Sequence, residues 1–157
     1  MKEFEINLIV DIRAIPRSRT NPQYNSEPFG EALAELQIGY RHIEALGGLR
    51  GQSRTVPADI NAYWKNKSFH NYADYAMGEH FHTGLLELRE LGRNARCAIM
   101  CAEAVWWRCH RRITTDYLIA SGEPVFHIFG RNHFEQAHMT SHARSGPNDV
   151  LHYPADV

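Results

Sequence analysis

The stretch Cys97-Ala-Ile-Met-Cys-Ala-Glu-Ala-Val-Trp-Trp-Arg-Cys-His-Arg-Arg112 decides the fold class of this chain. Its first four residues are apolar, which is typical of a buried strand, and helical spacing begins after Cys109. In α/β sheets, a strand that ends in reactive side chains and leads into a helix is a common place for a ligand. Arginines and a histidine gather at this helix start, where the helix dipole disfavours cations. We therefore expect a negatively charged group to bind among them.

Four short apolar runs alternate with segments of helical spacing. The runs are Asn7–Ile12, Tyr40–Ile43, Cys97–Met100 and Pro124–Phe129. Helical spacing occurs at 26–39, 68–76, 81–92 and 113–122. The alternation predicts an α/β fold with a mostly parallel sheet and helices on both faces, in a Rossmann-like three-layer arrangement. We expect one α/β domain over residues 1–130, with residues 131–157 forming an extended histidine-rich tail packed on the same domain.

Composition excludes several classes of protein. The chain has 157 residues and a net charge of −1, so bulk attraction to nucleic acid or to anionic membrane is not indicated, although a local basic patch is compatible with it. No apolar run approaches the roughly 18 residues of a membrane span. Three cysteines are an odd number, and the first residues do not resemble an export signal. We expect reduced thiols in a cytoplasmic protein.

Polar side chains follow each of the four expected strands. If the strands are parallel, these side chains lie along one edge of the sheet, which is the usual ligand crevice of an open α/β fold. The residues concerned are Asp11, Arg13, His42, Cys101, Glu103, His127 and Arg131.

A basic loop, residues 13–19, follows the first strand directly. Guanidinium groups bind phosphate or carboxylate through paired hydrogen bonds. The alternative is a solvated loop whose arginines pair with Glu27 or Glu31. The residues expected to bind an anion are Arg13, Arg17, Arg19, Asn21, Arg108, His110 and Arg111.

Cys101, Glu103 and Asp11 are the catalytic candidates. Cys101 is either a nucleophile, favoured by nearby cations, or a small buried side chain. Its loop does not match a phosphatase loop, because six residues rather than five separate it from Arg108 and they include bulky side chains. Glu103 is expected to pair with Arg108 or Arg111, or to act as a general acid or base. Asp11 is a base, a metal ligand or, most commonly, the partner of a neighbouring arginine.

The side chains of Cys101, Cys109 and His110 are also of the types that bind metals. Zinc sites usually draw on more closely spaced cysteine pairs and need a fourth ligand. The histidines of the tail lack close pairing. We therefore expect no metal and no cofactor.

An aromatic segment, Tyr63–Tyr75, is interleaved with Lys65 and Lys67. Such a segment either stacks on a nucleobase or packs an aromatic helix stripe on the sheet, and the second interpretation is favoured. Trp106 and Trp107 are expected to divide between packing and exposure, because neighbours on a turn face different ways.

Several motifs together resemble the bacterial domain of unknown function family 488 over about residues 8–130. The resemblance implies an α/β fold and marks the motif residues as the site, but it implies no reaction. The motifs are Asp11-Ile-Arg13, Pro16–Arg19, Asn21–Asn25, Leu46-Gly-Gly48, Tyr72–Met77, Met100–Glu103 and Cys109–Arg111.

The chain departs from this family at its start, where a strand reading like Thr-Ile-Gly-His-Ser and its helix are expected before Asp11 but only Met1–Ile6 precede Asn7. Loss of these elements leaves apolar surface or a strand edge uncovered, so we expect either a homo-oligomer that covers it or a local difference from the relatives. The missing polar corner also puts catalytic competence in question.

The leading functional expectation is a cytosolic protein with an arginine-lined anion pocket that binds or acts on a phosphate-containing ligand, such as a nucleotide or nucleic acid. One alternative is a binding module without turnover. The other is a metal-supported hydrolase that uses Asp11, Cys101, Cys109 and His110.

Overall fold

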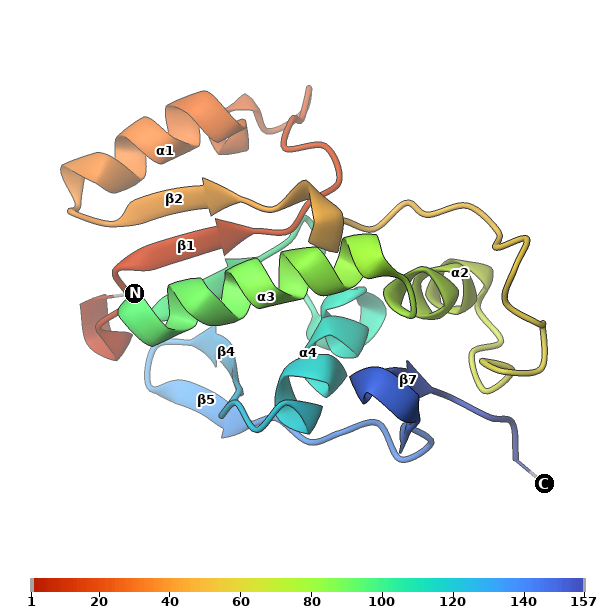
Figure 1. Ribbon diagram of the computed structural model, residues 1–157. Coiled ribbons are helices and arrows are strands. Elements are labelled where there is room, and N and C mark those ends of the chain that lie inside the picture. Colours follow the sequence, from red (N-terminus) through yellow and green to blue (C-terminus); the bar gives the residue numbers. More distant parts are fainter. Residues whose placement is uncertain (1, 157) are drawn as a thin grey trace.

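A parallel sheet of three strands forms the centre of the molecule (Figure 1), in a computed structural model that describes residues 2–156. Its strand order is β2-β1-β3. The strands are β1 (Leu8–Asp11), β2 (Gly39–His42) and β3 (Cys97–Met100).

The register places the ends of the three strands level with one another. Asp11, the last residue of β1, is paired with His42 on one side and with Met100 on the other. Because the strands are parallel, the segments that follow these three residues leave the sheet at the same edge. The sequence prediction that the polar residues after β1, β2 and β3 share an edge is confirmed.

Four α-helices form within residues 2–156, each at a segment where helical spacing predicts one. None of these helices is long and apolar enough to cross a membrane. The Asn66 side chain caps the second helix by accepting hydrogen bonds from the backbone N–H groups of Ser68 and Phe69. The helices are α1 (Ser26–Glu35), α2 (Lys67–Ala76), α3 (Glu79–Asn94) and α4 (Arg111–Ala120).

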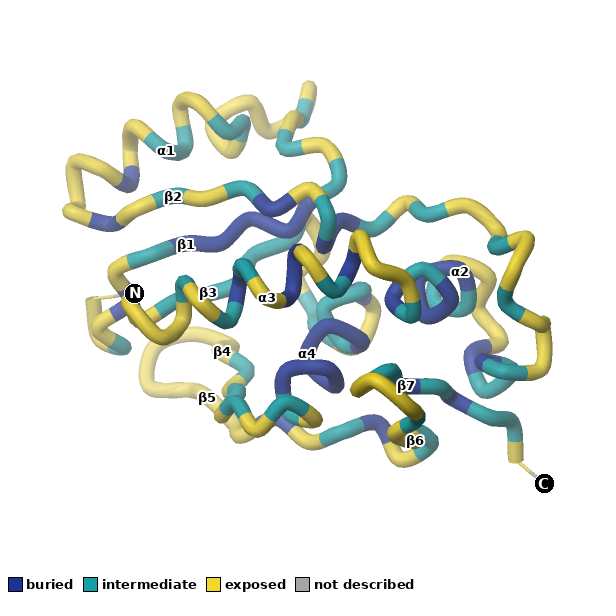
Figure 2. Tube along the Cα trace, viewed as in Figure 1, coloured by how far each residue is buried: buried dark blue, intermediate teal, exposed yellow. Residues whose placement is uncertain are grey.

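Alternating side chains of β1 join two separate apolar clusters. Ile9 packs with Leu33 of α1. Val10 packs in the larger cluster with Phe81 of α3 and Ile113 of α4. Because successive side chains of a strand point to opposite faces, each face of β1 is covered by apolar side chains. Figure 2 shows the result, with β1 buried between its neighbours.

The prediction that the run Pro124–Phe129 adds a parallel strand to this sheet is wrong. The run forms β4 (Phe126–Gly130), which pairs antiparallel with β5 (His133–Gln136) in a sheet of its own. The return is a tight turn in which Asn132 has a φ of 52°, a left-handed conformation that asparagine tolerates. Only two residues separate β4 from β5, so the two strands can pair as a hairpin. Pairing with the parallel sheet would instead require a longer crossover connection.

The segment after β5 completes the core around α4. It contains the short strands β6 (Arg144–Ser145) and β7 (Leu151–His152), which pair antiparallel. Leu151 and Tyr153 are fully buried. The Tyr153 hydroxyl donates to Asp116 of α4 over 2.9 Å, and the Leu151 carbonyl accepts from Tyr117 over 3.3 Å. The segment 137–153 therefore contributes Leu151 and Tyr153 to the folded core.

Candidate functional site

A buried ion pair occupies the carboxyl end of β1. Arg13 donates to both carboxylate oxygens of Asp11 through Nε (2.9 and 3.0 Å) and to Oδ2 through Nη2 (2.6 Å). The Tyr40 hydroxyl donates to the same carboxylate, and Arg13 also donates to the Tyr24 carbonyl over 2.7 Å. The pair connects β1, β2 and the loop before α1, which gives Asp11 and Arg13 a positioning role.

These contacts fix the charges of the pair. Burial opposes ionisation of Asp11, but hydrogen bonds from Arg13 and Tyr40 outweigh it and lower the pKa of the carboxyl group. Burial and the neighbouring carboxylate raise the pKa of Tyr40 to about 12. Asp11 is therefore a carboxylate, and Tyr40 a neutral donor, across the physiological range.

The side chain of His110, the residue that precedes α4, is held in one orientation. Its Nε2 lies 3.0 Å from the carbonyl oxygen of Ile12, directly after β1. A carbonyl only accepts hydrogen bonds, so Nε2 carries a proton; in the neutral form of the ring, Nδ1 then has a free lone pair. Nδ1 lies 3.8 Å from Sγ of Cys101 and 3.6 Å from Sγ of Cys109.

The three groups form a compact set, here called the thiol–imidazole cluster: Cys101, Cys109 and His110. Their sulfur and nitrogen atoms all lie within 4.8 Å of one another. Ionised thiols and a neutral imidazole nitrogen are all acceptors, so they approach this closely only when a proton or a cation lies between them.

Arg111 adds a positive charge next to the cluster. Its backbone N–H and its Nε donate to Sγ of Cys109 over 3.4 and 3.3 Å. Its Nη2 donates to the backbone carbonyl of Glu103 over 2.5 Å, which holds the loop after β3 against the start of α4. Arg111 therefore both shapes this loop and stabilises negative charge on sulfur.

The two thiols of the cluster titrate differently. A hydrogen bond from Cys109, with support from His110, lowers the pKa of Cys101 to about 4 against the opposing effect of burial. The thiolate of Cys101 and burial raise the pKa of Cys109. Cys97 lies in β3 outside the cluster, and burial raises the pKa of its thiol. The negative charge of the cysteine pair therefore lies on Cys101, the more exposed of the two sulfurs.

Two glycines bring the loop after β2 close to the cluster. A Cβ on Gly48 would lie 3.0 Å from Nδ1 of His110, and a Cβ on Gly47 would lie 2.6 Å from Cα of Ala14. Tyr72 of α2 donates to the Leu46 carbonyl over 2.7 Å, and its ring centroid lies 5.0 Å from that of His110. Gly48 and Tyr72 belong to motifs that carry the family resemblance, but neither was assigned a role from the sequence; the Gly-Gly pair signals a close backbone approach.

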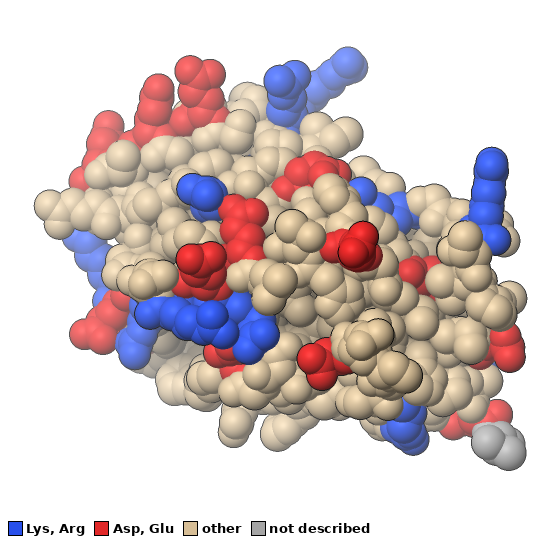
Figure 3. Space-filling view, viewed as in Figure 1, with Lys and Arg blue, Asp and Glu red and all other residues tan. Residues whose placement is uncertain are grey.

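The remaining expected anion-binding residues are exposed. Arg17, Arg19 and Arg108 make no side-chain hydrogen bond or ion pair with any residue in 2–156. Asn21 is also exposed. Figure 3 shows basic side chains projecting above the loop between β1 and α1, and acidic side chains over α1.

The expected pairing of Glu103 with Arg108 or Arg111 is not found. The Glu103 carboxylate accepts a hydrogen bond from the backbone N–H of Ala104 over 3.1 Å. Arg111 contacts the backbone carbonyl of Glu103 and not its carboxylate. The side chain is exposed at the loop after β3. The hydrogen bond to the neighbouring backbone N–H competes with an ion pair to a guanidinium group, because it is local in sequence.

The other residues expected near the strand ends have separate partners. His42 contacts the Arg13 carbonyl through Nε2 over 2.7 Å. His127 belongs to β4 and stacks on Trp106, with ring centroids 4.2 Å apart and planes within 3°. Trp107 is 46% exposed, so the two tryptophans divide between packing and exposure.

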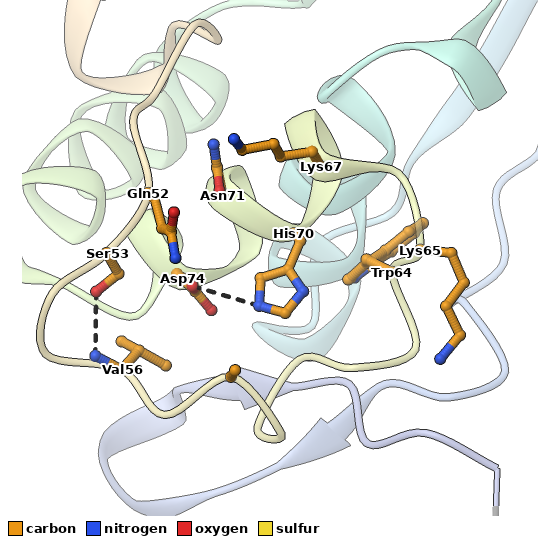
Figure 4. A pocket seen from close by; sticks show the side chains of 10 residues that line it. Gln52, Ser53, Val56, Trp64, Lys65, Lys67, His70, Asn71 and Asp74 are labelled. Carbon is orange, nitrogen blue, oxygen red and sulfur yellow. Dashed lines mark hydrogen bonds and ion pairs between the residues drawn. The ribbon is translucent and has the colours of Figure 1, made fainter.

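A separate pocket of about 280 Å³ lies beside α2 (Figure 4). No member of the thiol–imidazole cluster lines it. His70 and Asp74 meet in it at 3.5 Å. Trp64 lines the pocket and stacks on Phe69 with ring centroids 5.1 Å apart. Trp64 and Tyr72 are buried in the same apolar cluster as Val10 of β1, as the favoured interpretation of packing on the sheet predicts. The pocket is lined by Gln52, Ser53, Val56, Ala58, Trp64, Lys65, Lys67, His70, Asn71 and Asp74.

The comparisons with known proteins give a family. The family model described as "Domain of unknown function DUF488" matches residues 1–118, which contain the whole parallel sheet and the thiol–imidazole cluster. No curated protein and no solved structure matches the chain. Because the match covers 118 of the 157 residues, the chain belongs to the DUF488 family.

Proposed function

We propose that the protein is an enzyme that acts on a phosphate-containing ligand, such as a nucleotide or the end of a nucleic acid, with the thiol–imidazole cluster as its reaction centre. One observation carries the proposal. The Ile12 carbonyl orients His110 so that Nδ1 faces two thiols at the carboxyl edge of a parallel sheet. A nitrogen base held next to sulfur at the carboxyl edge of a parallel sheet is an arrangement found in active sites.

The exposed arginines supply the anion-binding part of the proposal. Arg17 and Arg19 follow β1, and Arg108 directly precedes Cys109 of the cluster. All three guanidinium groups are free to form paired hydrogen bonds with phosphate oxygens. Arg13 is already engaged by Asp11, so its contribution is to hold the loop that carries the other two.

The residues divide the work as follows. The cluster prepares the attacking group, and Cys101 is the less buried of its two cysteines, since Cys109 is only 3% exposed. As the new bond to phosphorus forms, the bond to the leaving oxygen breaks and that oxygen takes up a proton. We assign the delivery of this proton to Glu103, whose carboxyl group is exposed in the loop that joins Cys101 to Cys109.

A substrate panel tests the proposal. Nucleotides, phosphorylated sugars and oligonucleotides with 5′ or 3′ phosphate are incubated with the full chain, with and without added zinc, and phosphate release is measured. Turnover that Cys101→Ser and His110→Gln abolish, and that Cys97→Ser leaves intact, is expected. Saturable binding without turnover, lost in Arg108→Ala, would instead indicate a binding module. Neither turnover nor binding of any phosphate compound would refute the proposal.

The setting of this chemistry is also part of the proposal. Three free thiols fit a reducing cytoplasm. The two apolar clusters on opposite faces of β1 support a small Rossmann-like three-layer arrangement. β3 lies at the sheet edge with its residues only half-buried, which supports a second copy of the chain as its cover. Sedimentation of the purified protein as a monomer at all concentrations would refute the proposed homo-oligomer.

A further inference from the structure

The two nitrogen–sulfur distances of the thiol–imidazole cluster match those of a tetrahedral metal site. Zinc binds cysteine sulfur at about 2.3 Å and histidine nitrogen at about 2.0–2.1 Å, so at tetrahedral angles the nitrogen and sulfur ligands lie about 3.6 Å apart. Nδ1 of His110 lies 3.6 and 3.8 Å from the two sulfurs. Direct hydrogen bonding without a metal does not require both sulfurs to lie at this distance from one nitrogen.

The surroundings of the cluster also suit a metal. Histidine ligands of metals usually donate their other ring N–H to a carbonyl or carboxylate, and His110 donates to the Ile12 carbonyl in this way. Arg111 donates twice to Sγ of Cys109, which places a positive charge beside this sulfur. Gly48 has no side chain where a Cβ would lie 3.0 Å from Nδ1. The lone pair of His110 is therefore left accessible.

We infer that Cys101, Cys109 and His110 bind one zinc ion, with the fourth coordination position open to water or to a substrate oxygen. Two thiolates and an imidazole are ligands that favour zinc over harder cations, and the two negative charges balance the ion. Spacing along the chain argues against this site, because the cysteines are eight positions apart rather than three. The loop from β3 to α4 brings them together, and Arg111 holds it in place through the Glu103 carbonyl.

The use of the ion rests on the proposed function. Zinc with three protein ligands and an open position lowers the pKa of a bound water or polarises a phosphoryl oxygen. The attacking group prepared by the cluster is then this water, and Cys101 acts as a metal ligand. Zinc binding itself does not depend on what the substrate is.

Metal titration of the full chain tests the inference. The protein is reduced, stripped of metal with a chelator, and titrated with zinc by calorimetry and with cobalt by absorption, where thiolate coordination gives a charge-transfer band. One ion per chain is expected. Cys109→Ser and His110→Gln should each weaken binding by more than about 100-fold, since even outer contacts of metal ligands are worth about 10–100-fold. Cys97→Ser should bind as the wild type does.

Gly48→Ala provides a second variant that keeps all three ligands. Its methyl group would crowd Nδ1 of His110, so zinc affinity should fall about 10-fold while the fold, followed by near-ultraviolet circular dichroism, is retained. Zinc binding that survives Cys109→Ser and His110→Gln would belong to other histidines and would overturn the inference, as would the absence of any binding in the wild type.

The two proposals fail separately. Turnover of a phosphate compound by a wild-type protein that binds no zinc in the titration would refute the zinc site and leave the proposed function intact. One bound zinc ion without turnover or binding of any phosphate compound would refute the proposed function and leave the zinc site intact.

Discussion

At the scale of single residues, polar contacts decide how the sheet edge is built. Asp11 and Arg13 are both buried, and each provides the main counter-charge for the other. Replacing one partner of such a pair leaves the other as an uncompensated buried charge, which costs far more than a surface ion pair contributes.

Asp11→Asn should lower the unfolding free energy at pH 7 by about 3–5 kcal/mol, because Arg13 then stays buried without a counter-charge. The pKa of Asp11 is lowered in the folded state, so its stabilising effect is complete above the unfolded pKa of about 4 and is lost as pH falls through the lower folded value. Urea denaturation at several pH values measures both. The difference between wild type and variant should narrow below about pH 4.

Glu87→Gln is the matched control, because it removes the exposed ion pair with Arg41. It should change stability little at any of these pH values. A gap between wild type and Asp11→Asn that stays constant down to acid pH would contradict the role given to the Asp11 carboxylate.

Tyr72→Phe should destabilise the protein by about 1–3 kcal/mol, because it leaves the buried Leu46 carbonyl without its donor. The same carbonyl precedes Gly47 and Gly48, so zinc affinity should also fall. Thermal unfolding and metal titration measure the two effects. Tyr63→Phe is the control, since the Tyr63 hydroxyl has no hydrogen-bond partner in residues 2–156, and an equal loss in both variants would argue against this role for Tyr72.

At the scale of helices and strands, local patterns predict the elements well. Apolar spacing places α1 to α4, and a short apolar run places β1, β2 and β3. A side-chain cap sets one boundary: α2 begins after Asn66, whose side chain accepts two backbone hydrogen bonds. These signals are local in sequence, so they can be found without knowing what packs against each element.

Asn66→Ala should therefore lower the unfolding free energy by about 1 kcal/mol, as the loss of an N-cap does in other helices. Asn66→Asp should retain most of the stability, because a carboxylate accepts the same bonds and suits the helix dipole. Chemical denaturation measures both variants. Equal destabilisation by alanine and aspartate would show that the cap is not the source of the effect.

The site is only partly predictable at this scale. Parallel strands bring Asp11, His42 and Cys101 to one edge, and the sequence pattern foresees this. It assigns His110 to anion binding, whereas the Ile12 carbonyl turns Nδ1 toward two thiols. It also disfavours Cys109 as a partner of Cys101. Both differences arise from the path of the loop after β3, which no periodicity specifies.

At the scale of the whole molecule, contacts between distant segments complete the fold. The apolar run at β4 resembles the other strands in composition, but it pairs with β5 in a hairpin. The residues after β5 contribute Leu151 and Tyr153 to the main apolar cluster. Both lie beyond the residues that match the family model. Strand pairing and packing depend on all the segments that compete for the same surface. The sequence pattern therefore predicts that β4 is a strand, but not which strand it pairs with.

Leu151→Ala should lower the unfolding free energy by about 2–5 kcal/mol, because the side chain is fully buried and its loss leaves a cavity. Leu49→Ala makes the same change at a side chain that is 87% exposed, and it should alter stability by less than about 0.5 kcal/mol. Guanidinium denaturation compares the two. Similar values would mean that residues 137–153 do not form part of the core.

The most direct test of the reaction centre is a crystal structure of the protein with a bound phosphate-containing ligand. The phosphorus atom is expected beside Cys101 and His110, with its oxygens in contact with Arg108 and with at least one of Arg17 and Arg19. A phosphate bound in the pocket beside α2, or anywhere else away from the thiol–imidazole cluster, would contradict the assignment of this cluster as the reaction centre.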